Sequence, residues 1–163
     1  MSTPTGAISN RLARILRGED PELLLRMPSG YAVLGKYQPD AVRGCCMLLP
    51  DPVVASPNEL SHAQREQFFS DLVLLGDAVL EATGAERINY LVLCNQVPEL
   101  HGHAIPRFAE EDPELRMQGP FEAYDFGSAP VADAGGAEAE LHAKLRTALE
   151  GLLEYRAAHD SSG

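Results

Sequence analysis

A single amphipathic segment, residues 61 to 83, restricts the possible folds of this chain more than any other stretch. Its apolar side chains recur every three or four residues, which is the period of one helix face. They are Phe68, Leu72, Leu75, Val79 and Leu80. Ser61 and Gln64 have the spacing of a capping box, and Gly84 stands where a helix commonly ends. The pattern predicts one long helix with an apolar face.

Shorter elements lie on both sides of this helix. The apolar patterns predict a short helix at 7–16, strands at 31–34, 45–49, 88–94 and 100–105, and a second long helix at 137–158. The residues at 36–44 and the four at 95–98 are expected to connect strands as antiparallel hairpins. This order predicts an α+β domain in which helices cover one face of an antiparallel sheet.

The 163 residues predict one domain, and 45% apolar residues suffice for a hydrophobic core. We expect an N-terminal helical segment at 1–30 and a core at 31–108. An acidic loop and a C-terminal helix at 109–163 are expected to pack on the same domain.

The net charge of −11 limits the partners of the chain. Twelve acidic and four basic side chains follow residue 108, so most of the excess lies late in the sequence. Nucleic acids and anionic membranes repel such a chain, and neither is expected as a partner. A small phosphate ligand stays possible where positive groups gather locally.

The cysteines and the first residues predict a cytoplasmic protein. Cys45, Cys46 and Cys94 are odd in number and two are adjacent, which favours free thiols in a reducing compartment over disulfides. The first ten residues lack the pattern of a signal peptide. No apolar run is long enough for a membrane span.

One stretch, NQVPELHGHAIPRF at 95–108, concentrates the residues that could do chemistry. Because side chains alternate across a strand, His101 and His103 are expected on one face, with Glu99 in line with them. Gly102 leaves the opposite face bare, which suits the close approach of a helix or a second subunit.

The residue types alone leave three interpretations open. One imidazole can attack phosphorus while the other donates a hydrogen bond to a phosphate oxygen. The pair with Glu99 can instead bind a metal, although residues two apart on a strand are about 6.6 Å apart. The pair can also be two polar residues on a solvated sheet face.

The run RINYLVLCNQVPELHGHAIPRF at 87–108 resembles the signature hairpin of the histidine-triad (HIT-like) superfamily. The segments YAVLGKYQ and RGCCMLLPDPVV and the long helix ending in TGA occur upstream in the same order. The resemblance covers about residues 31–108. It implies a HIT-like antiparallel sheet with the long helix packed on it. Helices at the N- and C-terminal ends complete the expected fold.

The resemblance also implies roles for individual residues. His101 takes the position of the nucleophile and His103 that of the phosphate contact. Glu99 stands where the family has its first histidine, and Asp51 stands where many relatives have another. Glu99 is nonetheless expected to act as a second hydrogen-bond acceptor for the nucleophile or as a general base for water. Its carboxylate would raise the pKa of both histidines. The implied substrate-binding residues are Asn95, Arg107, Gln38 and Lys36.

The implied activity is nucleotide hydrolysis or nucleotidyl transfer at the α-phosphate, through a nucleotidyl-histidine. The substrate would be a nucleoside polyphosphate, such as a diadenosine polyphosphate, or a phosphoramidate. No metal or other cofactor is expected. The alternative is a degenerate nucleotide-binding or regulatory module. The resemblance further implies a homodimer with the long helix at its interface, including Phe68, Phe69, Leu72 and Leu75. A role of the acidic segment in capping the pocket or in substrate choice is left open.

Overall fold

The computed structural model describes residues 6–160, which form a five-stranded antiparallel sheet with the order β1-β2-β3-β5-β4. The strands are β1 (Leu23–Met27), β2 (Gly30–Leu34), β3 (Cys46–Pro50), β4 (Arg87–Leu91) and β5 (Gly102–Arg107). The helices are α1 (Ala7–Leu16), α2 (His62–Thr83), α3 (Pro113–Arg116), α4 (Pro120–Ala123) and α5 (Ala139–His159). Short 3₁₀ turns lie at Asp40–Val42, Pro57–Glu59 and Phe126–Ser128. The predicted α+β class is confirmed.

The long helix α2 begins and ends where its sequence predicts. The Gln64 backbone N–H donates to Ser61 Oγ at 3.2 Å, and the Ser61 N–H donates to Gln64 Oε1 at 2.9 Å. These two bonds satisfy donors that a helix N-terminus leaves free. At the other end Gly84 has a φ of 72°, a left-handed conformation that glycine adopts without steric cost.

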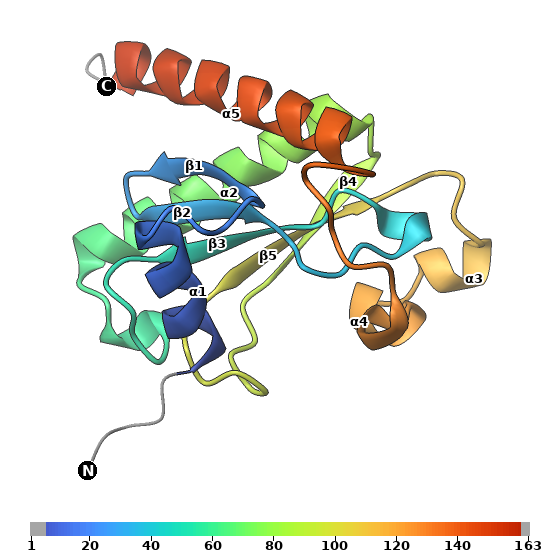
Figure 1. The fold of residues 1–163 in the computed structure, drawn as a ribbon, viewed down its shortest axis with the longest axis horizontal. Coiled ribbons are helices and arrows are strands. Elements are labelled where there is room, and N and C mark those ends of the chain that lie inside the picture. Colours follow the sequence, from blue (N-terminus) through green and yellow to red (C-terminus); the bar gives the residue numbers. More distant parts are fainter. Residues whose placement is uncertain (1–5, 161–163) are drawn as a thin grey trace.

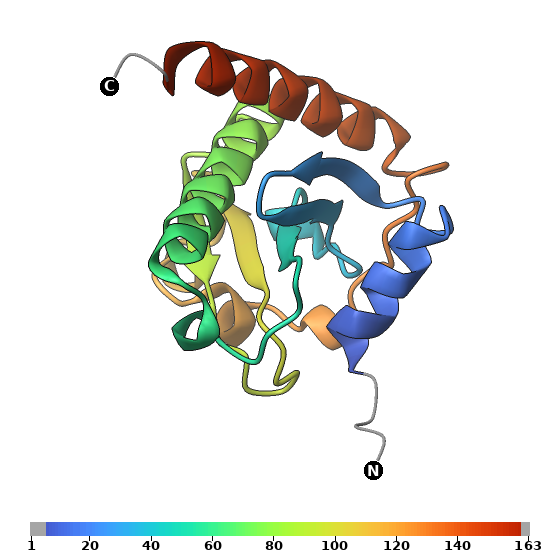
Figure 2. The ribbon, with the colours of Figure 1, turned by 90° about the vertical axis from the view of Figure 1, so that its left-hand side faces the viewer.

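Helices cover both faces of the sheet, not one as expected. α2 and α5 lie on one side, and α1 with the segment after β5 lies on the other (Figures 1 and 2). The helix α1 is drawn to the second face because Ile8, Leu12 and Ile15 pack against Val33 and Leu49 there. Successive side chains of a strand point to opposite faces, so an apolar strand such as β2 needs a cover on each side.

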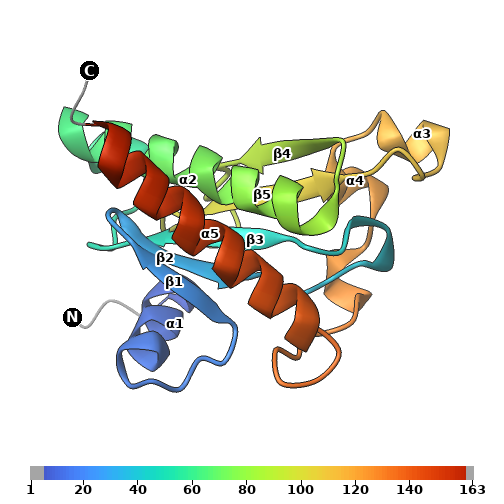
Figure 3. The same cartoon turned by 90° about the horizontal axis from the view of Figure 1, so that it is seen from above.

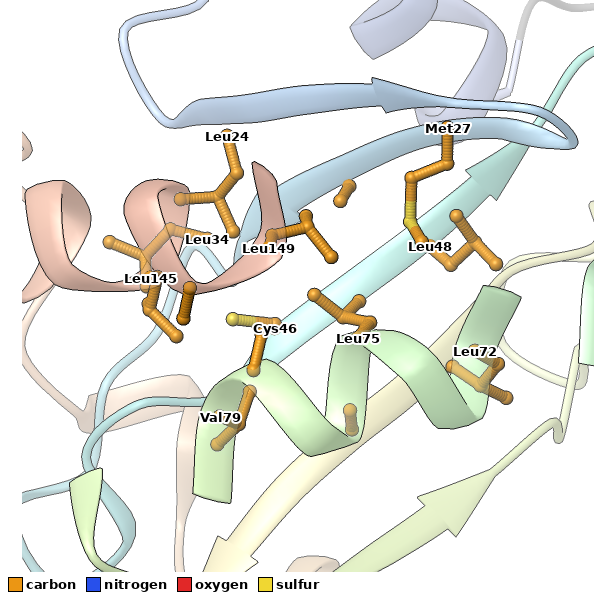
Figure 4. Packing of buried hydrophobic residues seen from close by; sticks show 14 of the residues in the cluster. Leu24, Met27, Leu34, Cys46, Leu48, Leu72, Leu75, Val79, Leu145 and Leu149 are labelled. Atoms are coloured by element: carbon orange, nitrogen blue, oxygen red, sulfur yellow. The ribbon is translucent and has the colours of Figure 1, made fainter. Parts of the chain in front are cut away.

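The larger core lies between the sheet, α2 and α5 (Figure 4). α5 crosses over α2, and both helices lie above the sheet (Figure 3). Leu34, Leu75 and Leu149 are fully buried here, and burial of each such side chain stabilises the fold by about 1.5–3 kcal/mol. A Cβ on Gly102 would lie 2.9 Å from Leu72 of α2, so α2 makes the close approach expected at this glycine.

Two elements differ from the sequence-based expectation. Leu23–Met27, within the segment predicted as helical, is strand β1 and pairs with β2. The β4–β5 connection is the ten-residue loop 92–101 instead of a four-residue turn. The chain leaves the sheet there because Leu100 is fully buried and its N–H donates to the Val54 carbonyl at 2.7 Å.

The three thiols are free, as the cysteine pattern predicts. Cys45 and Cys46 are free and buried, and burial raises the pKa of the Cys45 thiol to about 12. Cys94 is also free and is partly exposed. Within residues 6–160, no helix combines the length and apolar character needed to cross a bilayer.

Candidate active site

His101 is the last residue of the 92–101 loop, directly before β5, and only 8% of it is exposed. Its Nδ1 lies 2.7 Å from the backbone carbonyl oxygen of Glu99. A carbonyl oxygen can only accept, so Nδ1 carries the proton and donates it. In the neutral ring Nε2 is then the unprotonated nitrogen with a free lone pair. The loop backbone therefore sets the tautomer that a nucleophilic histidine needs.

His103 lies beside His101 from within β5. The two ring centroids are 5.0 Å apart with the ring planes at 79°. Burial, together with the smaller effect of the neighbouring His101, lowers the pKa of His103 from its ordinary 6.5 to about 4. His103 is therefore neutral at pH 7 and can donate a hydrogen bond without carrying a charge.

The expected row of Glu99, His101 and His103 on one strand face does not form. Glu99 lies outside β5, and its carboxylate accepts hydrogen bonds from the Ile8 N–H at 3.2 Å and from the Ser9 hydroxyl. These groups belong to the first turn of α1, whose free N–H groups attract a carboxylate. The prediction that this carboxylate raises the pKa of both histidines is wrong for His103, whose pKa is lowered.

The N-terminus of α1 is shaped to receive this carboxylate. A Cβ on Gly6, the residue before α1, would overlap Glu99 Oε1. Glu99 thus contributes twice, because its backbone orients His101 and its side chain holds α1 against the loop. Sequence reasoning missed this contact because Glu99 and Ser9 are far apart in the chain.

Residues 108–133, here called the strap, cross the His103 face of the sheet (Figures 1 and 2). The ring of Phe121 lies 5.1 Å from that of His103, and Phe126 lies 4.8 Å from Phe121. Tyr124 and Phe126 also pack against Ile105. The strap is therefore an aromatic cover beside the imidazole pair. The sequence signal was the clustering of three aromatic residues within an acidic, Pro-rich segment.

The comparisons with known proteins agree on the architecture. No family model and no curated protein matches the sequence. A solved histidine triad protein from Bradyrhizobium japonicum superposes with a TM-score of 0.65 and 19% identity, over 90% of this chain and 99% of its own. One from Sinorhizobium meliloti 1021 does so with a TM-score of 0.65 and 23% identity, over 90% and 98%. A hypothetical histidine triad nucleotide-binding protein from Sulfolobus tokodaii strain 7 has a TM-score of 0.63 and 14% identity, over 90% and 93%.

This chain has the histidine-triad fold. The likeness extends well beyond residues 31–108, because it covers nine-tenths of the chain. At identities this low the superpositions establish the fold alone, and the chemistry of the site has to be argued from its own residues.

Arg107 lies on the same sheet face as His103, but its guanidinium is turned to protein groups. Its Nε and Nη2 donate to the Glu111 carboxylate at 3.0–3.2 Å. Its Nη1 donates to Asn89 Oδ1 at 2.8 Å and to the Gln118 carbonyl at 2.7 Å, and Nη2 also reaches the Leu115 carbonyl. All of its donors are used, so Arg107 holds the strap on the histidine-triad sheet instead of offering a phosphate contact.

The buried partner of Arg107 is the centre of a small polar network. Burial opposes ionisation of Glu111, yet hydrogen bonds from Arg107, Tyr124 and the Phe108 N–H keep the pKa of Glu111 below its ordinary value. Burial and this carboxylate raise the pKa of Tyr124 to about 12. Sequence reasoning missed Glu111 and Tyr124, although Arg107 and Glu111 have the spacing of an ion pair.

The side chains of Gln38 and Lys36 contact groups of the β2–β3 connection. The buried Gln38 amide bonds to the backbone of Gly35, Gly44 and Cys45, all within the β2–β3 connection. The Lys36 ammonium lies 5.3 Å above the ring of Tyr37. Their backbones hold the far end of the strap, because Gln38 N–H donates to the Pro130 carbonyl and the Ala132 N–H donates to the Lys36 carbonyl. Of the two side chains expected to bind nucleotide, Gln38 thus has a structural role, and Lys36 is exposed.

Asn95 lies exposed in the 92–101 loop, and its expected contact with ribose or phosphate stays a prediction.

In the part of the chain that the structure describes, no group of three His, Cys, Asp or Glu side chains is placed to hold a metal ion. Ser29 Oγ is the only fully buried side-chain nitrogen or oxygen within residues 6–160 that lacks a hydrogen-bond partner. Nε2 of His101 and both ring nitrogens of His103 also have no hydrogen-bond partner in the described chain, yet they are not among the fully buried atoms. Solvent can therefore reach them.

Proposed function

We propose that this protein binds a nucleotide and acts at its α-phosphate, as a hydrolase or a nucleotidyl transferase. The observation that carries the proposal is the hydrogen bond between His101 Nδ1 and the Glu99 carbonyl, which leaves Nε2 free to attack. The nucleotide-binding histidine triad protein from Sulfolobus tokodaii, which has the same fold, supports the choice of ligand.

The proposed reaction has two displacements at phosphorus. His101 Nε2 forms a bond to the α-phosphorus, and the bond from phosphorus to the leaving group breaks, so that the leaving group departs with the electron pair. Water then attacks the nucleotidyl-histidine, the P–N bond breaks, and the proton of the water passes to solvent. A nucleoside monophosphate and neutral His101 result. Nucleoside polyphosphates, including diadenosine polyphosphates, have phosphate anions as leaving groups, whereas the amine of a phosphoramidate takes up a proton from solvent as it leaves.

His103 is assigned to the phosphate oxygens. Because its pKa is about 4, it is neutral at pH 7, and an N–H of its ring would donate to a non-bridging oxygen that gains charge in the transition state. A neutral donor also leaves the site free of a fixed cation. Glu99 is assigned a positioning role, since its carbonyl orients His101 while its carboxylate is engaged by α1.

The decisive variant is His101→Ala. It should abolish turnover across a panel of adenosine and guanosine polyphosphates and phosphoramidates, and it should abolish the nucleotidyl adduct detected by mass spectrometry after rapid quenching. The exposed His62, on the opposite face of the sheet, supplies a matched control in His62→Ala. Wild-type rates in His101→Ala on every substrate found would disprove the assignment.

A binding module without catalysis is the second candidate. It is favoured by Glu99, which replaces a histidine and turns its carboxylate to α1, and by the position of Phe121 against His103. Calorimetric binding of a nucleotide with no turnover across the same panel would support it. Restored turnover in Glu99→His would indicate the decay of an ancestral active site.

We also propose that two copies pair through α2 and β4. Of the four α2 residues expected at a dimer interface, Phe68, Leu72 and Leu75 belong to the core of the chain itself. Phe69 is 42% exposed and continues into an apolar stripe with Val73 at 50% and Tyr90 at 40%. The Tyr90 ring lies over Gly76, one helical turn beyond Val73. The stripe borders the outer edge of β4, whose unpaired backbone groups can bind a second strand.

Light scattering after size exclusion tests the pairing. The wild type should have the mass of two chains, and Val73→Glu should convert it to one, because the charge would be buried at the interface. Glu66→Lys, at an exposed position elsewhere on α2, should leave the mass unchanged. A monomeric wild type would overturn the proposal.

A further inference from the structure

A cavity of about 480 Å³ lies at the Arg107 end of β4 and β5, separate from the imidazole pair. Strand positions 87, 89 and 107 form one wall, and residues 116–119, from the last residue of α3 to the residue before α4, form the other. Arg107 lies four positions after His103 in β5, which is about 13 Å along a strand. The apolar cluster of Ile105, Tyr124 and Phe126 fills the space between them. The cavity therefore needs an explanation of its own.

Two arginines face each other across the strands at this cavity. Arg87 and Arg107 are direct partners in the β4–β5 register, so their side chains leave the sheet on the same face. Like charges directly opposite each other destabilise a strand pair. The Glu111 carboxylate neutralises Arg107, whereas Arg87 has no carboxylate within 4 Å among residues 6–160. The positive charge of Arg87 is thus left without a counterion from the described chain.

The remaining polar groups of the cavity are mainly hydrogen-bond donors. Asn89 Oδ1 accepts from Arg107 Nη1 at 2.8 Å, which fixes the orientation of the Asn89 amide and leaves its NH₂ group available. The Gln118 carbonyl is already occupied by Arg107. Among residues 6–160, Glu86 supplies the one carboxylate that lines the cavity, and it lies 3.8 Å from the Arg116 guanidinium in a contact that is half exposed on both sides. Donors and positive charge therefore exceed acceptors around the cavity.

We propose that this cavity is a binding site for the phosphate group of a small phosphorylated molecule. The Arg87 and Arg116 guanidiniums would bind the phosphate oxygens from the two walls, with the Asn89 NH₂ group as a third donor. Guanidinium groups bind phosphate oxygens through paired N–H donors, and a dianion satisfies two of them at once. In a chain with a net charge of −11, such a local cluster is what makes binding of an anion possible.

Such a ligand would connect β4 to the strap. Arg116 and Gln118 belong to the strap, and Arg107 joins the same residues to the sheet. A phosphate held by both Arg87 and Arg116 would add a second tie at this point. The inference stands independently of the nucleotide chemistry proposed for His101, because none of its residues contacts the imidazoles.

The test titrates the full chain with inorganic phosphate and, in parallel, with glycerol phosphate and citrate, and follows backbone amide shifts by NMR. Phosphate should shift the amides of Asn89, Gln118 and Gly119 at lower concentration than it shifts His101. Arg87→Ala should weaken this binding by about tenfold or more, and Arg87→Lys should weaken it less. Arg146→Ala, which removes an exposed guanidinium of α5, should leave the dissociation constant unchanged.

Several outcomes would overturn the inference. They are unchanged phosphate affinity in Arg87→Ala, the absence of shifts at residues 89 and 118–119, and equal weakening by Arg146→Ala, which would indicate general screening. Citrate binding with no response to either phosphate probe would reject a phosphate site in favour of a carboxylate site. Because Arg87 is exposed, its substitution should not unfold the chain, and the unchanged amide spectrum of α2 verifies this.

Discussion

The sheet face under α2 and α5 is held mainly by aliphatic side chains, whereas the face that carries His103 adds charged and aromatic contacts to the smaller aliphatic cluster under α1. On the first face, leucines of three elements interlock in one core. On the second face, Glu99 holds α1, Arg107 holds the strap, and Phe121 covers His103. Apolar packing tolerates no water, while a polar cover can open without exposing a large apolar surface. The larger apolar core thus lies on one face, and the imidazole pair lies on the other with the buried Arg107–Glu111 ion pair.

The largest effect is expected from Glu111→Ala on the polar face. The change leaves the Arg107 guanidinium buried without its counterion, and loss of one partner of a buried pair costs about 3–5 kcal/mol of unfolding free energy. Glu110→Ala, at the exposed neighbouring position, should change it by less than about 0.5 kcal/mol. Urea denaturation measures both. Similar small values for the two variants would show that the strap contributes little to global stability.

Leu75→Ala tests the apolar face. Leu75 is completely buried against the sheet, so the lost contacts and the cavity should cost about 2–5 kcal/mol. Leu16→Ala, at a position of α1 that is 73% exposed, is the control and should cost far less. The position of the His103 imidazole resonances should stay unchanged in Leu75→Ala, because α2 packs on the other face. Movement of those resonances would mean that the two faces are coupled.

Protonation of His103 should destabilise the fold as the pH falls. The unfolded chain takes up this proton near pH 6.5, whereas the folded chain takes it up only near pH 4. Stability linked to His103 is thus fully present above pH 6.5 and is lost between pH 6.5 and 4, by about 3 kcal/mol.

The measurement is the difference in unfolding free energy between the wild type and His103→Gln at several pH values. This difference should change between pH 6.5 and 4. The contributions of the other titrating groups cancel, because both proteins contain them. Phe121→Ala should raise the pKa of His103 toward 6.5 by exposing the ring to water, as followed by NMR titration. A pH-independent difference would contradict the buried, neutral state of His103.

The smallest effect is expected from Glu99→Gln. The amide keeps an oxygen for the Ile8 N–H but removes the charge at the helix N-terminus, at a cost of about 1–2 kcal/mol. Hydrogen exchange of the α1 amides should accelerate. The His101 tautomer should not change, because the Glu99 backbone carbonyl that sets it remains. A changed tautomer would show that the carboxylate, and not the carbonyl, orients His101.

Local pattern was sufficient for the elements whose signals lie within one turn or one strand. The α2 helix is an example, since Ser61, Gln64 and Gly84 act on neighbours only a few residues away. The length of a strand was poorly predicted where a contact with a distant segment ends it. β4 ends at Leu91 because the chain must turn away to bury Leu100 and to pair with Val54, and neither requirement is visible in residues 88–105 alone.

The site residues divide in the same way. Alternation along β5 correctly separates His103 from Gly102, with the glycine against α2. It could not place Glu99, whose side chain follows α1, or Arg107, whose donors are taken by the strap. A charged side chain goes to the partners that the tertiary fold brings near, and these partners lie up to 91 residues away.

The sequence by itself determined the α+β class, the long capped helix, the buried free thiols and the two imidazoles next to a strand, because each depends on periodicity or on near neighbours. Only the tertiary structure decided what covers the second sheet face, which ring nitrogen of His101 is free and why His103 is neutral. These properties depend on desolvation and on hydrogen bonds between segments that are distant in the chain, and such contacts exist only after the sheet has brought α1, β5 and the strap together.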